Sequence, residues 1–255
     1  MDLIVLGTNH KYSELSLREK LSFSKKKTKE ALCLLKEKNI LNGAIILSTC
    51  NRIEIYASAG DANSSIKEIE EFICFYQGLR KCDISPYLYR YKGSVALRHL
   101  FCVASGMDSL ILGERQIAGQ VKEALLCGKN NEFVDEPLEK MFKGALAFAR
   151  RVHQDTKISQ GKVSIGSIAI DFIKEKLTNL CDRSILIIGV GKVTELILKY
   201  LKKEKLKVVF ISNRTLEKAK YLAAKIGAKA VNFDEFDRYL NEADVIISAT
   251  RSPNF

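Results

Sequence analysis

The chain has 255 residues, with 41 lysines and arginines against 30 aspartates and glutamates, so its formal net charge is +11. This length is sufficient for two domains of ordinary size, and the positive charge favours an anionic partner such as a nucleic acid. No apolar run reaches the roughly 18 residues of a membrane span, and no secretion signal is recognisable, so we expect a cytoplasmic protein without a membrane partner.

The cysteine pattern argues against structural disulfides and against zinc. Seven cysteines form an odd number and include no C-x-x-C pair. His99 and Cys102 have a metal-like spacing, but no second pair accompanies them. We therefore expect neither a disulfide framework nor a bound metal.

Short apolar runs and amphipathic patterns alternate in the first 91 residues. Strands are predicted at four places: residues 2–6, 44–47, 53–57 and 88–91. Helical periodicity occurs at two places: residues 24–38 and 65–76. Strands mixed with helices in this order predict a compact α+β domain.

Cys50 lies between two of the predicted strands, in the stretch STCNRIEIY that begins at Ser48. This placement can display a nucleophilic thiol, and the guanidinium of Arg52 can raise its thiolate fraction. The alternative is a buried structural cysteine at a strand end, because free cysteine is among the most buried residue types.

A long helical region follows from Glu114, interrupted at residues 130–132. Its apolar stripes predict core positions: Ile117, Val121, Ala124, Leu125, Leu138, Met141, Phe142, Ala145, Ala149 and Val152. His153 falls in a basic stretch and is interpreted as an ordinary helical residue. Residues 159–161 resemble a linker into a second domain.

The second domain has the pattern of a dinucleotide-binding fold. A helix at residues 164–177 precedes a buried parallel strand at 184–188, and the turn that follows leads into a helix at 195–203. Further strands are predicted at residues 207–211 and 244–248. The turn carries the candidate cofactor residues Gly189, Val190, Gly191, Lys192, Val193 and Thr194.

Two details of this fingerprint are informative. Thr194 occupies the third position, where glycine or alanine allows close helix packing. The second strand ends in Asn213, Arg214 and Thr215, without the acid that binds the ribose of NAD. Because Arg214 can pair with a 2′-phosphate, we expect NADPH as the cofactor, with a solvated loop arginine as the alternative.

Together these segments resemble the glutamyl-tRNA reductase family. STCNRIEIY is similar to that family's active-site segment, and GERQIAGQ, which begins at Gly113, is similar to a second motif. Four further stretches match in order: residues 6–10, 15–20, 99–101 and 104–109. The resemblance covers nearly the whole chain.

The resemblance implies an α/β protein with an N-terminal α+β catalytic domain, residues 1–158, and an incomplete Rossmann-like NADP-binding domain, residues 159–255. It implies NADPH-dependent reduction of glutamyl-tRNA to glutamate-1-semialdehyde through a cysteine thioester, the first step of tetrapyrrole biosynthesis. Cys50 is the implied nucleophile, and His99 is implied to assist proton transfer or to orient the ester. The implied substrate-binding residues are Thr49, Asn51, Arg52, Ser109, Glu114, Arg115, Gln116 and Gln120.

The sequence departs from the family in two respects. Arg115 occupies a position where the family often has proline. The family's members are homodimers with a further C-terminal domain, which is absent here, so we expect either a fragment or a shortened member. One alternative function is a non-reducing relative that binds tRNA or a partner protein. Another is an NADP-dependent dehydrogenase of the shikimate type, which leaves the first domain unexplained.

Overall fold

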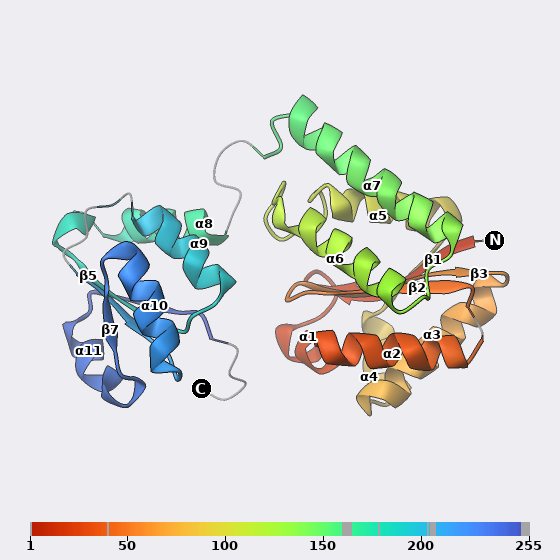
Figure 1. Cartoon of the computed structure of the whole chain (residues 1–255). Coiled ribbons are helices and arrows are strands. Elements are labelled where there is room, and N and C mark those ends of the chain that lie inside the picture. The colour runs from red at the N-terminus through yellow and green to blue at the C-terminus, as the bar shows by residue number, and fades with distance from the viewer. Residues whose placement is uncertain are drawn as a thin grey trace. The chain divides into compact units, whose positions relative to one another are not determined.

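The computed structural model describes residues 2–39, 41–159, 165–177, 179–202, 204 and 208–250. The chain divides into two compact units, Met1–Gly161 and Lys162–Phe255, each with its own sheet (Figure 1). The predicted domain boundary after residue 158 stays a prediction, and residues 160 and 161 of the predicted linker lie outside the described residues. The predicted first residues of a helix, 164, and of a strand, 207, also lie outside them.

The first unit is built on an antiparallel sheet with the strand order β2-β3-β1-β4. Three strands extend the predicted ones by one to three residues at an end: β1 (Asp2–Asn9), β2 (Gly43–Ser48) and β3 (Arg52–Ala59). The fourth, β4 (Tyr89–Lys92), is shifted by one residue from the predicted strand 88–91. Every residue of the central strand β3 is buried, because helices cover both faces of the sheet.

Two helical layers enclose this sheet (Figure 1). One layer contains α1 (Leu15–Leu21), α2 (Lys25–Glu37), α3 (Ala62–Gln77) and α4 (Lys81–Ile84), which the 3-10 turn Ser85–Tyr87 follows. The opposite layer contains α5 (Gly93–Ala104), α6 (Gln116–Asn130) and α7 (Glu136–Asp155). Most of the predicted apolar stripe on α6 and α7 is buried in the second core, which confirms that interpretation.

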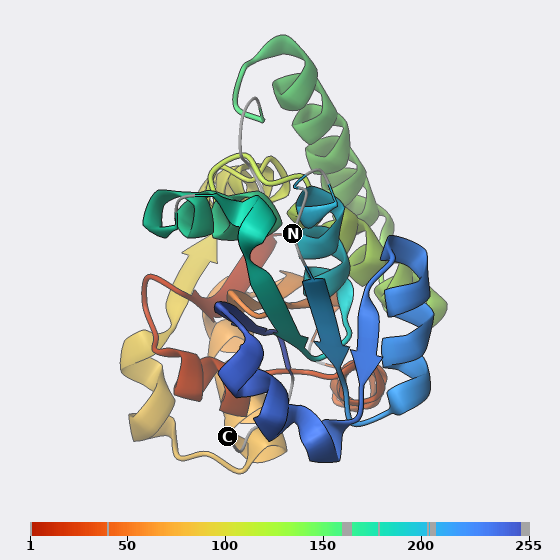
Figure 2. The same ribbon diagram turned by 90° about the vertical axis from the view of Figure 1, so that its left-hand side faces the viewer.

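The second unit contains a wholly parallel sheet with the order β7-β6-β5-β8, whose strands lie side by side in Figure 2. Its strands are β5 (Ser184–Ile188), β6 (Val208–Ser212), β7 (Lys229–Val231) and β8 (Val245–Ser248). This order is that of one half of a Rossmann fold, as predicted.

Helices cover both faces of the parallel sheet. On one side lie α8 (Ile165–Lys176), α9 (Lys192–Leu201) and α10 (Leu216–Ile226), and on the other lies α11 (Phe236–Glu242). Short 3-10 turns occupy Leu180–Asp182 and Phe233–Glu235. Among the described residues, no helix combines the length and the apolarity that a membrane crossing requires.

Candidate active site

Cys50 lies in the turn that joins β2 to β3. Thr49 fixes this turn, because its backbone N–H donates to the Arg52 carbonyl at 2.8 Å and its hydroxyl accepts from the N–H groups of Asn51 and Arg52 at 3.2 and 3.1 Å. The His10 N–H donates to the Asn51 carbonyl at 2.9 Å and ties the turn to the end of β1. The Cys50 side chain is exposed, as predicted for a displayed thiol.

The surroundings of Cys50 disfavour its thiolate. Partial burial raises the pKa of the thiol, and the charge of Glu114 raises it further, whereas Arg18 acts in the opposite direction. Arg18 also donates from Nε to the Cys50 carbonyl at 3.2 Å. Arg18 is the cation that lowers the Cys50 pKa, and the expectation that Arg52 raises the thiolate fraction stays a prediction.

Arg52 is instead buried beneath the turn and paired with two carboxylates. Its side chain is 1% exposed; it donates to Glu54 Oε1 at 2.8 Å and to Asp108 Oδ2 at 3.1 Å, and it also contacts the Asp108 carbonyl. Lys11 neutralises the second oxygen of Asp108. Burial alone would raise the pKa of Asp108, but the bonds from Lys11 and Arg52 outweigh it and lower that pKa.

Glu54 is the centre of a buried network. It accepts hydrogen bonds from Arg52, from Tyr56 at 2.6 Å, from Tyr89, and from His99 Nε2 at 2.8 Å. Burial disfavours the charged carboxylate, but Arg52 and the bonds from His99 and Tyr56 outweigh it and hold the Glu54 pKa far below its usual range. Glu54 is therefore ionised, and since a carboxylate only accepts, Nε2 of His99 carries the shared proton.

His99 lies in the buried part of the site, next to Glu54. It projects from α5, is 11% exposed, and packs against the rings of Tyr89 and Tyr91 with centroid distances of 5.2 and 5.0 Å. No hydrogen bond joins His99 to Cys50 within the part of the chain that the structure describes. Its predicted roles stay predictions, and its contact with Glu54 favours an orienting role over direct proton transfer to sulfur.

The loop between α5 and α6 supplies further predicted substrate residues. Gly106 and Gly113 have positive φ angles of 73° and 75° and close the loop with a 2.9 Å bond from the Gly113 N–H to the Gly106 carbonyl. Within it, the Ser109 hydroxyl oxygen is buried and has no hydrogen-bond partner in the described part of the chain. Such an oxygen is available to a polar group of a ligand.

The remaining predicted substrate residues lie at the start of α6. Arg115 immediately precedes this helix, and Gln116 and Gln120 share one face of its first turns. The structure thus brings Thr49, Asn51, Arg52 and Glu114 to the Cys50 turn. For the two glutamines it shows only this position on the helix.

Sequence reasoning missed several members of the site. His10 and Arg18 lie within the two N-terminal motifs but received no role, and Asp108 and Glu54 lie within others. The Nδ1 atom of His10 is buried, and no described residue forms a hydrogen bond with it. Burial and the charge of Arg52 lower the pKa of His10, so its imidazole is neutral at pH 7. The place of these residues within the motifs was the signal that could have identified them.

The glycine turn after β5 has the geometry of a phosphate site. Gly189 has φ of 97°, and a side chain there would collide with the Ala249 carbonyl. Gly191 immediately precedes α9, which begins at Lys192, three residues earlier than predicted. No side chain caps this helix, and a Cβ at Gly191 would meet nothing within 4 Å. A helix N-terminus that ends in free space attracts a phosphate group.

Thr194 and Asn213 complete this turn. The Thr194 side chain is buried and its hydroxyl donates to the Gly189 carbonyl at 2.8 Å, so the departure from the fingerprint is accommodated within the turn. Asn213 Oδ1 accepts from the Val190 N–H at 3.3 Å, and its Nδ2 donates to the Thr215 carbonyl at 3.0 Å. Because β5 and β6 are parallel neighbours, the two predicted cofactor segments meet at one edge of the sheet.

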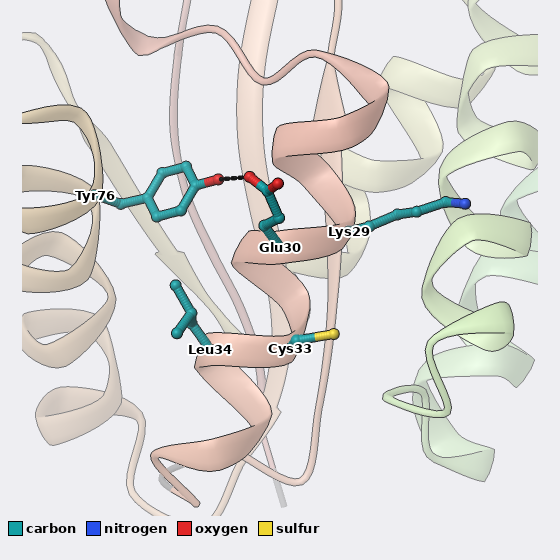
Figure 3. Close-up of a pocket in the computed structure, with 5 residues that line it drawn as sticks. All are labelled: Lys29, Glu30, Cys33, Leu34 and Tyr76. Carbon is teal, nitrogen blue, oxygen red and sulfur yellow. Dashed lines mark hydrogen bonds between the residues drawn. The ribbon is translucent and has the colours of Figure 1, made fainter.

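A separate surface hollow lies between α2 and α3. Figure 3 shows the five residues that line it: Lys29, Glu30, Cys33, Leu34 and Tyr76. The Tyr76 hydroxyl donates to Glu30 at 3.3 Å and closes one end. None of the predicted site residues lines this hollow.

The fold and the site together define a two-domain protein that combines a displayed cysteine with a dinucleotide-binding sheet. Residues 6–156 match the N-terminal domain of glutamyl-tRNAGlu reductase, and residues 171–255 match the shikimate/quinate 5-dehydrogenase family. The chain belongs to the glutamyl-tRNA reductase family, as its motifs predicted. The shikimate-type alternative accounts for the second unit only.

Individual relatives agree with this assignment. The chain is 39% identical to the glutamyl-tRNA reductases of Shewanella baltica strains OS155 and OS185, over 99% of its own length and 60% of theirs. Among solved structures, glutamyl-tRNA reductase from Methanopyrus kandleri matches with a TM-score of 0.62 and 35% identity, over 98% of this chain and 59% of that one. The chain therefore spans about three fifths of the length of these relatives.

Proposed function

We propose that this chain reduces glutamyl-tRNA to glutamate-1-semialdehyde with NADPH through a thioester on Cys50, the entry step of tetrapyrrole synthesis from glutamate. The observation that carries the proposal is the exposed thiol on a fixed turn, directly above the buried network of Arg52 and Glu54. The family assignment supplies the substrate class.

The first half-reaction is a transacylation. The Cys50 thiolate attacks the carbonyl carbon of the ester, a C–S bond forms, and the C–O bond to the terminal ribose of the tRNA breaks. The leaving ribose oxygen takes up a proton. Because burial and Glu114 raise the Cys50 pKa, the thiolate is scarce at pH 7 and the rate of this step rises with pH.

Charged and polar groups around the turn can hold the glutamyl moiety. The carboxylate of Glu114 attracts its α-ammonium group, and the Ser109 hydroxyl, which has no partner among the described residues, can donate to its side-chain carboxylate. We assign Arg52 to this recognition on the basis of its family motif, and its pairs with Glu54 and Asp108 fix the guanidinium in place. We assign Thr49, Asn51, Arg115, Gln116 and Gln120 to the same recognition role on the basis of the family motifs.

The residues of the second unit fit a dinucleotide. The free space at Gly191 lets a pyrophosphate approach the first N–H groups of α9, and Arg214, at the end of β6, lies where a 2′-phosphate is recognised in this fold. When bound, NADPH supplies the hydride that reduces the thioester. The residues Gly189 to Thr194 and Asn213 to Thr215 hold and orient it.

Acid-quenched intact-protein mass spectrometry tests the proposal directly. After the protein is mixed with glutamyl-tRNA alone, we expect a glutamyl adduct that peptide mapping places on Cys50, and we expect it to disappear with release of semialdehyde when NADPH is added. Cys82→Ser is the matched control, since Cys82 is also exposed and free, and it should behave as wild type. An unchanged adduct in Cys50→Ser would refute the nucleophile, and no adduct at all would favour the alternative of a non-reducing RNA- or partner-binding protein.

A further inference from the structure

A basic pocket of about 230 Å³ lies between α6 and α7 of the first unit. Its lining consists of Arg115, Ala118, Ala149, Arg150, His153 and Gln154, without any carboxylate. Within the described part of the chain, neither Arg115 nor Arg150 forms an ion pair. Two guanidinium groups therefore face the same hollow with their hydrogen-bond donors available.

His153 contributes a further unpartnered group to this pocket. Its Nδ1 lies 2.6 Å from the Ser159 hydroxyl, whereas its Nε2 is buried and has no hydrogen-bond partner among the residues that the structure describes. When the Ser159 hydroxyl donates to Nδ1, the imidazole proton lies on Nε2 and lacks an acceptor. A buried donor without an acceptor is costly, and an anion in the pocket would satisfy it.

The pocket adjoins the candidate active site through the start of α6. Arg115 directly follows Glu114, whose charge acts on Cys50. The loop that carries Glu114 is also packed against the residues that follow α7, because a side chain at Gly113 would collide with the Ile158 carbonyl. A group bound by Arg115 and Arg150 is therefore held beside the loop that faces the thiol.

We propose that this pocket binds a backbone phosphodiester of the substrate RNA close to its aminoacylated 3′ end, an inference that rests on the proposed function. Arginine forks match the geometry of phosphate oxygens, and phosphate contacts position a nucleic acid without reading its sequence. A small phosphate compound shares this chemistry. We assign the pocket to RNA because an ester attacked by Cys50 brings the phosphodiesters of its terminal nucleotides to the rim of the site.

Binding of uncharged tRNA, measured by fluorescence anisotropy over a range of salt concentrations, tests the assignment. We expect the double variant Arg115→Gln/Arg150→Gln to weaken binding by about tenfold or more, since charge-assisted hydrogen bonds are lost. The slope of log K against log salt should fall in magnitude by about 0.7, the value for one phosphate contact on a single strand. Arg151→Gln is the matched control, because Arg151 is the exposed neighbour on α7, pairs with Asp155 at 3.9 Å and does not line the pocket.

Adduct formation on Cys50 separates this inference from the proposed function. At a subsaturating concentration of glutamyl-tRNA the single variant Arg150→Gln should form its adduct about tenfold more slowly than wild type, whereas 3′-O-glutamyl adenosine, which lacks phosphate, should react equally with Arg150→Gln and wild type. A wild type that reacts with neither substrate would refute the proposed function, while the anisotropy arm would still report on the pocket.

Three outcomes would overturn the assignment. The first is an unchanged affinity and salt slope in the double variant with an unchanged melting temperature. The second is an equal loss in Arg151→Gln, which would show a general effect of charge. The third is binding of inorganic phosphate, followed by quenching of the protein's fluorescence, that is lost in the double variant while the affinity for tRNA is unchanged. That result would assign the pocket to a small phosphate compound.

Discussion

Replacing Glu54 by glutamine tests the interpretation that one buried carboxylate organises the active site. The substitution keeps the shape of the side chain but removes its charge, so Arg52 keeps only Asp108 as an anionic partner, at 3.1 Å. The amide also introduces two donors into a cluster that already consists of donors, namely Tyr56, Tyr89 and His99. At least one of these groups must lose its acceptor.

The expected cost follows from burial. The Arg52–Glu54 pair spans 2.8 Å with side chains that are 1% and 0% exposed. Breaking such a pair by removal of one member costs about 3–5 kcal/mol, because the remaining charge stays buried. Since Asp108 and one amide oxygen offset part of the loss, we expect the free energy of unfolding of the first unit to fall by about 3 kcal/mol.

Urea unfolding, with hydrogen exchange of peptides from β3 as the readout, measures this change in the free energy of unfolding. Glu30→Gln is the control; Glu30 lies on α2 with a half-exposed side chain, and we expect an effect within about 0.5 kcal/mol. The Glu54 pKa lies below its ordinary value of 4.5 in the folded state, so its contribution is complete above pH 4.5 and is lost as the pH falls further. A difference below about 1 kcal/mol at pH 7, or one that does not shrink between pH 5 and 3, would refute the reasoning.

Three further predictions concern single groups of the two sites. Alkylation of Cys50 by iodoacetamide, followed by mass spectrometry, should have a pH midpoint above the ordinary pKa of 9.0, and Glu114→Gln should lower it; a midpoint below 9.0 would mean that an unrecognised base activates the thiol. Arg214→Ala should weaken NADPH binding by about tenfold, measured by fluorescence titration, and leave NADH binding unchanged, whereas equal losses would remove its assignment to the 2′-phosphate. Gly191→Ala should leave the melting temperature of the protein alone unchanged and abolish its rise with NADPH. Gly189→Ala should lower the melting temperature itself, because a residue with a side chain is strained at a φ of 97°. Equal behaviour of the two variants would contradict the turn geometry.

The fold was predictable wherever periodicity was local and strong. The strand at residues 184–188 agrees with β5 at both ends, and the helix at 24–38 agrees with α2, which Ser24 caps by accepting from the Lys27 N–H at 3.3 Å. The sequence patterns predicted no element at α1, α4, α5, α10, α11 or β7. The first is short, and the strand β7 has only three residues, so its position depends on pairing with β6 rather than on its own pattern.

The chemistry of the candidate site was less predictable than its location. The motif around Cys50 identified the displayed turn, but the partners of Arg52 could not be read from neighbouring residues. Asp108 is 56 positions away in sequence and meets Arg52 only because the loop after α5 returns to the first residue of β3. The cation that lowers the Cys50 pKa is Arg18, 32 positions away in sequence, so neither the partners of Arg52 nor the cation beside the thiol could be read from sequence neighbours.

The alternation along β3 explains why the charged residues are buried at all. Arg52, Glu54 and Tyr56 share one face of the strand, while Ile53 and Ile55 share the other. Such alternation normally indicates one solvated face, yet α5, α6 and α7 cover the polar face here.

Glu54 also stands opposite Gly7 on β1, where a Cβ would lie 2.8 Å from its Cγ. We therefore expect Gly7→Ala to displace Glu54 by direct contact and, through Glu54, to disturb Arg52, although neither residue is itself substituted. The signature is a reduced rate of adduct formation on Cys50 with glutamyl-tRNA together with faster hydrogen exchange in β3, and an unaltered rate would show that the network does not position the turn.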